Sequence, residues 1–568
     1  MGLKIYKDTQ VQDYTNLEAG NILAGIPEQF NTYCLGFQKY TDAPTSCTSF
    51  VAQKLNHITY EVETETTLSS SLISVIDGLY VCDYQALLGV TLDNSIYRYK
   101  FVSSEGTFLS EPFKCIDSSL APVIEKILLT MDMSTPSTAT INLTFASGAL
   151  QIDWKDGAAV QNFATGVNLA HTYTVSGTYI AEITGNFENI TAFLAHSSKI
   201  TTVTGLQTGL LTNLQLHNNL ISGVLDLSEA LVSNLAFFYN NPSLTGITFA
   251  STGNQSTDIE ANDCYLTGVL NLANVPTANI DLNSNPLLTG VAFASSGNVL
   301  SSSFVMYSTG FVGVLDLSNK PIASTFNISD NPLLTAITFA STGNYPAQIN
   351  VASTGLIGTL DLSNNPVSGT FSSHTCPALT GITFAASNTI LTSLYLYGSN
   401  LTGGFSLANV PVSGVVRING NSLLTGITFA STGNGTVTTL NAYLCDLTGT
   451  LDLSNVPLAG VVSITNNANL TNVTFSSSGN GALTSFDAHD CALTNLDFSV
   501  FATSNGVYIS LTDNNMSATE VDNQIISLDA TGWTGGVINI DGNNAGSTAA
   551  SAAAITSLMG KGWTGAIN

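Results

Sequence analysis

A repeat of about 45 residues constrains the fold of this chain more than any other feature of its sequence. The segment LDLS, or a near copy of it, begins at Leu225, Leu270, Leu315, Leu360, Phe405, Leu451 and Leu496. The segment LTGITFASTGN and its relatives recur at the same spacing, with equivalent positions at Phe249, Phe293, Phe339, Phe384, Phe429 and Phe475. Each long repeat contains two shorter units, and a fixed short period of this kind predicts a solenoid of stacked coils.

The length and charge of the chain agree with this interpretation and exclude some functions. The chain has 568 residues, which is more than one compact core can hold. Only 9% of the residues are charged, the net charge is -26, and Lys320 and Arg417 are the only Lys or Arg residues between positions 200 and 560. We therefore expect no binding to nucleic acid. We expect no membrane insertion and no export signal, because no long apolar run occurs, at the N-terminus or elsewhere.

Each short unit contains the pattern L-x-L-x-x-N-x-L, which resembles the leucine-rich-repeat family over residues 188–515. In that family an Asn usually follows the strand, and here the position holds Asn219, Asn241, Cys264, Asn285, Thr309, Asn331, Thr354, Cys376, Ser399, Asn421, Cys445, Asn467 and Cys491. We expect these side chains to form a structural column that satisfies backbone groups at the turn of each coil. The outer half of each coil alternates apolar and polar residues with period two, which predicts short strands there, not helices.

The two ends of the chain lack the repeat. Residues 153–157 read DWKDG and are followed by HTY at 171–173 and GTY at 177–179, a set of motifs that resembles a PKD-type β-sandwich. Downstream, residues 517–520 have the form of a capping box, which predicts a helix there, and a second, Ala-rich helix is expected from Thr548 to Met559. Such helices would cover the last apolar coil.

The sequence therefore predicts a mainly β fold: a leucine-rich-repeat β-solenoid with β-sandwich N-terminal domains and a small helical C-terminal cap. The expected domains are a β-rich anchoring domain at 1–130, a PKD-like β-sandwich at 131–187, the solenoid at 188–515 with about 22–23 residues per coil, and an α/β cap at 516–568.

One column of side chains should point outward from the inner strands, because neighbouring residues on a strand face opposite sides. Its aromatic and imidazole members are His217, Tyr239, Tyr307, His374, Tyr397, Tyr443 and His489. Exposed aromatic rings and amides in a row are typical of a surface that binds carbohydrate or protein. The alternative is that these residues reflect only the β-propensity of an exposed sheet.

No enzymatic, metal or cofactor site is expected. His196 and His217 lie on adjacent coils, but no third ligand stands beside them. The Asp residues of the LDLS segments should lie about 10 Å apart, which is too far to share one ion. No known catalytic motif occurs, and a repeated motif is a poor basis for a single active site.

The cysteines of the polar column should be free thiols, because Cys264, Cys376, Cys445 and Cys491 lie two or more coils apart, about 10 Å at the closest. Free thiols are typical of a chain that folds in a reducing cytoplasm. Whether Cys34, Cys47, Cys82 and Cys115 form disulfides stays open, since no CxxC spacing occurs among them.

Residues 97–116, YRYKFVSSEGTFLSEPFKCI, resemble small β-domains in virion proteins of bacteriophages that infect Bacteroidetes. The resemblance implies a non-enzymatic virion protein, a tail or head fibre or decoration, assembled in the host cytoplasm. Its N-terminal domain would contact other virion proteins, and its solenoid would contact a host-surface glycan or protein, in several copies or as a homo-oligomer. The alternative is a bacterial cell-surface leucine-rich-repeat adhesin. The receptor, the copy number and a position on capsid or tail stay open.

Overall fold

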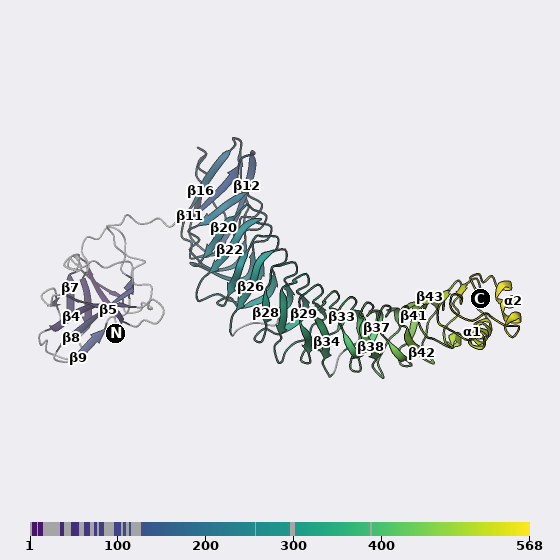
Figure 1. Cartoon of the computed structure of the whole chain (residues 1–568). Coiled ribbons are helices and arrows are strands. Elements are labelled where there is room, and N and C mark those ends of the chain that lie inside the picture. Colours follow the sequence, from purple (N-terminus) through teal and green to yellow (C-terminus); the bar gives the residue numbers. More distant parts are fainter. Residues whose placement is uncertain are drawn as a thin grey trace. The chain divides into compact units, whose positions relative to one another are not determined.

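The computed structural model describes the strands β1–β10 and residues 126–568, except Ser256, residues 296–300 and residues 387–388 (Figure 1). The chain divides into two units, Met1–Ile124 and Glu125–Asn568. The side chains of residues 1–125 lie outside the described part, and so does the question of disulfides among Cys34, Cys47, Cys82 and Cys115.

The first unit contains two five-stranded antiparallel sheets, ordered β2-β1-β3-β7-β6 and β10-β8-β4-β5, with β9 paired to β8. Their strands are β1 (Leu3–Lys7), β2 (Gln10–Tyr14), β3 (Cys34–Gln38), β4 (Cys47–Leu55), β5 (Val62–Leu68), β6 (Ile73–Ile76), β7 (Leu79–Asp83), β8 (Ile96–Ser103), β9 (Gly106–Leu109) and β10 (Phe113–Lys114).

The second unit begins with two antiparallel layers. Their strands are β11 (Lys126–Met133), β12 (Ser137–Phe145), β13 (Leu150–Asp153), β14 (Gln161–Asn162), β15 (Leu169–Tyr173), β16 (Gly177–Gly185), β17 (Ile190–Leu194) and β18 (Ile200–Thr204). One sheet has the order β14-β13-β16-β11-β18. The two layers meet where the buried Tyr173 hydroxyl donates to the Trp154 carbonyl at 3.0 Å and His171 stacks on the Trp154 ring.

The other layer continues directly into the solenoid. Strand β12 pairs antiparallel with β15 and with β17, and β17 pairs parallel with the next strand, β19 (Thr208–Gln215). One hydrogen-bonded sheet thus joins residues on both sides of position 187, where the sequence placed a domain boundary. The buried apolar residues of the two layers and of the solenoid belong to one continuous hydrophobic core.

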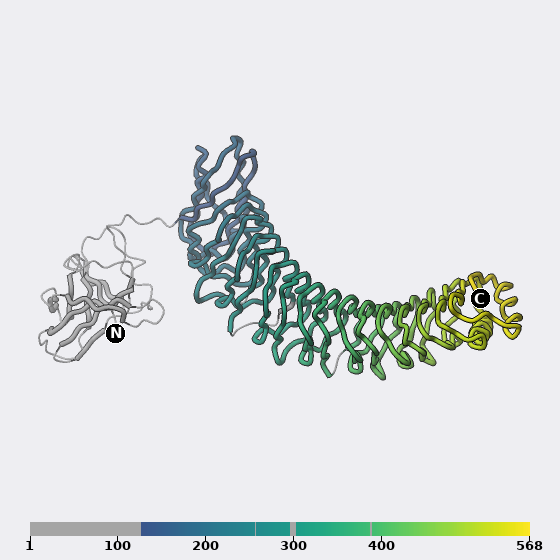
Figure 2. The backbone as a smooth tube through the Cα atoms, in the orientation of Figure 1, coloured from purple at the N-terminus to yellow at the C-terminus, as the bar shows by residue number. Residues whose placement is uncertain are grey.

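A β-solenoid fills the rest of this unit, as the repeat predicted, and its coils follow one another along a curved body (Figure 2). After β19, the parallel strands of its 18-stranded sheet are β21 (Ala230–Phe237), β23 (Thr257–Glu260), β25 (Thr277–Asp281), β27 (Ser301–Val305), β29 (Ile322–Asn327), β31 (Gln348–Asn350), β33 (Gly369–Ser372), β35 (Leu391–Tyr395), β37 (Val412–Arg417), β39 (Val437–Asn441), β41 (Leu458–Ser463), β43 (Leu483–Asp487), β44 (Tyr508–Ser510) and β45 (Val537–Asn539).

The outer halves of the coils are also strands, as the period-two alternation predicted. They pair in twos as β20 (Ser222–Leu227) with β22 (Ser243–Phe249), β24 (Thr267–Leu272) with β26 (Leu287–Phe293), β28 (Gly313–Asp316) with β30 (Leu334–Thr338), β32 (Gly358–Leu362) with β34 (Leu379–Phe384), β36 (Thr402–Ser406) with β38 (Leu423–Thr428), and β40 (Thr448–Leu453) with β42 (Asn469–Phe475). Two coils therefore form one outer sheet, which accounts for the doubled repeat.

Two helices form the outer halves of the last coils: α1 (Ala518–Ala530) and α2 (Ala552–Gly560). A capping box at Ser517 and Glu520 starts α1. Helix α2 starts at Ala552 and not at Thr548, where the sequence predicted it. The backbone N–H of Thr548 donates to Asp522 and holds the residues between Thr548 and Ala552 in a turn. The inner strands continue beneath both helices, through β45 and its bridge from Val537 to Thr564. Neither helix of the described residues is long and apolar enough to cross a membrane.

Candidate binding face

The candidate face is the solvent side of the 18-stranded sheet, and a column of buried polar side chains fixes its edge. Asn331 shows the geometry: its amide donates to the carbonyls of Met306 at 2.9 Å and Ile328 at 2.8 Å, on the preceding coil and its own. The same two donations are made by Asn219, Asn241, Asn285, Asn421 and Asn467. Each Asn ties two coils together where the chain leaves the sheet.

The four cysteines of this column are buried and free. Each thiol lies close to a carbonyl of the preceding coil, in the pairs Cys264–Phe238, Cys376–Val351, Cys445–Ile418 and Cys491–Ile464. Burial raises the pKa of Cys264, Cys445 and Cys491 to about 11, so these thiols stay protonated and unreactive at neutral pH.

The polar columns extend beyond the residues that the repeat identified. Asn514 and Asn544 continue the first column under the two helices, where both donate to the Leu511 carbonyl. A second column at the opposite corner contains Asn254, Asn344, Asn434 and Asn480. Its sequence signal is the Asn that ends each ASTGN segment, or SSSGN at Asn480, which lies outside the leucine-rich-repeat pattern.

A left-handed residue directly precedes most positions of the first column and turns the chain out of the sheet. Asn218 and Asp330 both have φ 55°, which Asn and Asp tolerate well. Leu444 has φ 53° at the equivalent place, although its bulky side chain disfavours this conformation by about 1 kcal/mol or more. The residue is 53% exposed, so burial offsets that cost only in part.

The outward column does not form one uniform exposed row. Tyr239, Tyr307, His374, Tyr397, Tyr443 and His489 are partly exposed. His217 is buried instead of exposed, because its ring is stacked between His196 at 4.6 Å and Tyr239 at 4.4 Å, measured between ring centroids. Burial, helped by the His196 charge, lowers the pKa of His217 to about 4. His217 is therefore a neutral packing element of the face.

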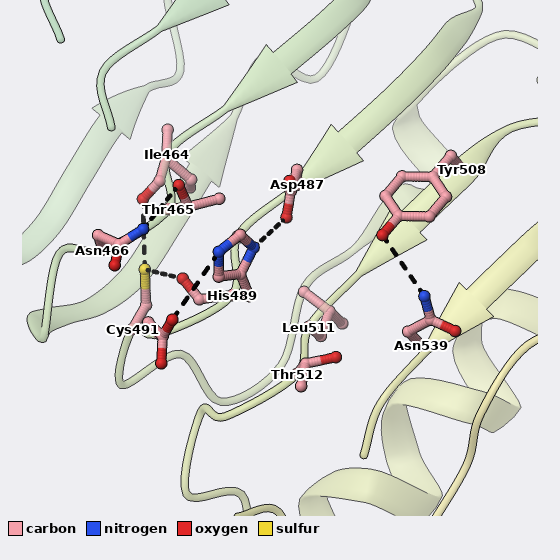
Figure 3. Close-up of polar contacts among 12 residues, drawn as sticks. Ile464, Thr465, Asn466, Asp487, His489, Cys491, Tyr508, Leu511, Thr512 and Asn539 are labelled. Atoms are coloured by element: carbon pink, nitrogen blue, oxygen red, sulfur yellow. Dashed lines mark hydrogen bonds and ion pairs between the residues drawn. The ribbon is translucent and has the colours of Figure 1, made fainter. Parts of the chain in front are cut away.

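Both ends of the face carry carboxylates. Figure 3 shows His489 near the C-terminal end, where Asp487 lies 2.7 Å from its Nδ1 and Asp490 lies 3.8 Å from its Nε2. Nearer the N-terminal end, Glu260 and Asp281 are direct neighbours on β23 and β25. Burial raises the pKa of both, and nearby carboxylates raise it further. No group of three or more metal-binding side chains occurs among the described residues.

An aromatic cluster lies between these acidic ends. The rings of His374 and Tyr397 are stacked with centroids 4.4 Å apart and an interplanar angle of 5°. On the neighbouring column of the same strands, the guanidinium of Arg417 lies 5.9 Å from the centre of the Tyr395 ring. The repeat pattern does not identify Tyr395 and Arg417. They lie two residues before members of the outward column, and alternate residues of a strand share one face of the sheet.

A scan against protein families, a search of curated proteins and a search of solved structures find no match for this chain.

Proposed function

We propose that this chain is a non-enzymatic recognition protein whose solenoid sheet binds a glycan or protein on a bacterial surface. One observation carries the proposal: aromatic and imidazole side chains remain partly exposed in one register of a rigid sheet, at Tyr307, His374, Tyr397 and Tyr443. Aromatic faces of this kind pack against the apolar faces of sugars and form the anchors of protein interfaces.

The architecture supports this role through avidity. The parallel strands hold successive outward side chains at about the 4.8 Å strand spacing, so contacts along the face add without reorganisation of the backbone. Several copies on one particle would multiply weak contacts into tight attachment.

The proposed setting is the virion of a bacteriophage, where the chain is a tail or head fibre or decoration protein. In this setting the N-terminal unit contacts other virion proteins, and the solenoid contacts the host. The resemblance of residues 97–116 to phage virion domains and the free thiols of the column support it. The likenesses of the repeats to leucine-rich repeats and of residues 131–187 to PKD-type domains fit a virion protein and a bacterial adhesin equally.

Adsorption to host cells tests the binding proposal. The full-length variant that combines Tyr307→Ala, His374→Ala, Tyr397→Ala and Tyr443→Ala should bind at least about tenfold less, the loss expected when interface anchors are truncated. The matched control combines Tyr265→Ala and Tyr345→Ala, which removes tyrosines exposed at the coil corners. Equal binding of the face variant and the control would refute the proposal.

Mass spectrometry of purified phage particles tests the setting. The chain should be present in washed particles in a fixed ratio to the other structural proteins. Recovery of the chain only from bacterial outer membranes would contradict the virion setting and favour the adhesin.

A further inference from the structure

The centre of the solenoid lacks acidic residues although the chain as a whole carries a net charge of -26. The sequence contains no Asp or Glu between Asp361 and Asp446. Within this stretch the outer segment that reads LDLS at Leu225, Leu315, Leu360 and Leu451 reads FSLA, with Ser406 in the place of the Asp, as Asn271 is in the segment at Leu270. Strands β33 to β39 therefore carry no carboxylate of their own. Acidic groups lie on either side of them, with Glu260, Asp281 and Asp330 on one side, where the Asp330 charge acts on His374, and Asp487 on the other.

A single exposed cation lies on this face. Arg417 is exposed on β37, whereas Lys320, the only other Lys or Arg between positions 200 and 560, is buried. Every Lys of residues 126–568 has a polar partner: Lys126 and Lys155 bond Glu182, Lys199 bonds Thr135, Lys320 bonds Thr277 and Lys561 bonds Asp529. The Arg417 guanidinium forms no hydrogen bond or ion pair with any described residue and contacts the Tyr395 ring.

Strand register places hydrogen-bonding and stacking groups around this cation. Arg417 pairs with Tyr395 on one side and Asn441 on the other. One step along the same face, the next column holds Tyr397, Asn419 and Tyr443, aligned by hydrogen bonds from Gly398 to Asn419 and from Gly420 to Tyr443. From β33 to β39 the cluster spans three strand spacings, about 14 Å, which is long enough for several sugar units.

The inference that follows rests on the proposed function. We propose that this cluster binds an acidic saccharide, with the Arg417 guanidinium bound to a sugar carboxylate. A guanidinium binds a carboxylate with two parallel N–H donors, which a neutral sugar cannot accept in the same way. The rings of Tyr397 and Tyr443 would pack against sugar faces. The amides of Asn419 and Asn441 can bond hydroxyl groups.

Leu444 adds an independent observation at the same place. It follows Tyr443 directly, keeps a left-handed backbone with φ 53° and leaves its side chain 53% exposed. Asn, Asp or Gly would relieve the strain, and these residues occupy the equivalent place in several other coils. Strained backbone conformations cluster at contact sites, and this one directly follows Tyr443 of the cluster.

Isothermal titration calorimetry of the full-length chain tests the proposal with a panel of oligosaccharides. The panel contains tetragalacturonate and sialyllactose, which carry carboxylates, methyl-esterified tetragalacturonate, which has the same rings without the charge, and a sulfated oligosaccharide. A carboxylated sugar should bind at least about tenfold more tightly than its neutral counterpart, and the difference should shrink with added salt. Arg417→Gln should remove this preference, and Arg417→Lys should restore part of it.

Lys155→Gln is the matched control, because it also removes one exposed positive charge but lies outside the solenoid sheet. It should leave binding unchanged. The proposal is wrong if no carboxylated sugar binds more tightly than the neutral ones, if Arg417→Gln has no more effect than Lys155→Gln, or if the sulfated sugar binds more tightly than every carboxylated one. Equal, Arg417-dependent binding of a poly-glutamate peptide would also overturn it, in favour of an acidic protein partner.

The outcomes separate this inference from the proposed function. Host-cell adsorption that depends on the four aromatic side chains but not on Arg417 would reject the acidic saccharide alone. Adsorption that is insensitive to all of these side chains would reject the binding face itself.

Discussion

Lys320 is buried at a coil corner where the equivalent positions hold Val275, Val410 and Val456. Its Nζ donates to the Thr277 carbonyl at 2.8 Å and lies 5.5 Å from the centre of the Phe293 ring. No carboxylate of the described residues pairs with it, and burial lowers its pKa from 10.5 to about 8.

This lowered pKa predicts a pH-dependent stability. Between pH about 8 and 10.5 the unfolded chain holds the Lys320 proton more strongly than the folded chain, so the free energy of unfolding rises with pH in this window, by about 3 kcal/mol. Lys320→Met lacks this dependence. Urea unfolding should therefore show that the free energy of unfolding of the natural chain rises by about 3 kcal/mol relative to that of the variant between pH 7 and 10.5. Parallel pH profiles for the two proteins would contradict the assignment.

The buried amide of Asn331 should contribute strongly to stability. Asn331→Ala leaves the carbonyls of Met306 and Ile328 without their donor and should lower the free energy of unfolding by about 2–4 kcal/mol. Asn469→Ala changes an exposed Asn and should cost less than about 0.5 kcal/mol. Chemical denaturation of both variants checks this, and similar costs would argue against the column as a source of stability.

For single residues, the sequence predicts the roles that follow from the repeat pattern, but not the roles that depend on side-chain rotamers. The L-x-L-x-x-N spacing identifies Asn331 because every coil repeats the same backbone turn. The burial of His217 follows from ring stacking with His196 and Tyr239: the repeat aligns these three residues, but it does not give the rotamers that stack their rings. Arg417 is a single departure from the repeat, so a search for recurring features passes over it.

A strand of the solenoid contacts mainly its two neighbours, which limits how far damage spreads. Leu396 follows β35 and has no exposed surface. Leu396→Asp places an unpaired charge in the core and should cost more than about 4 kcal/mol, with local unfolding of the adjacent coils. Amide hydrogen exchange should accelerate more in β33, β35 and β37 than in β19. Ser393→Asp, on the outward side of β35, is the control and should leave exchange unchanged.

The strands and helices could be predicted where the period of the apolar residues matches the period of the backbone. Alternation with period two predicts both the inner and the outer strands. The sequence also predicts α1 from its capping box, but it treats the C-terminal helices as a separate cap. The coils in fact continue under them, because parallel pairing of β44 with β45 needs only three residues on each strand, too few for a periodic signal.

At the scale of the whole molecule, the division after Ile124 predicts separable parts. A fragment of residues 126–568 should fold and bind host cells with the affinity of the full chain, since it contains the entire sheet face. The fragment 1–124 should not bind cells but should compete with the full chain for incorporation into virions. Pull-down and competition assays check both expectations. Cell binding by the fragment 1–124 alone would contradict this division of roles.

The most direct test of the account is hydroxyl-radical footprinting of the full-length chain bound to host cells. It compares tyrosines on the sheet face with tyrosines at the coil corners, without any mutation. The account predicts that Tyr397 and Tyr443 become protected from oxidation on binding, while Tyr265 and Tyr345 keep the rates of the free chain. Protection of Tyr265 and Tyr345, with Tyr397 and Tyr443 unchanged, would contradict it.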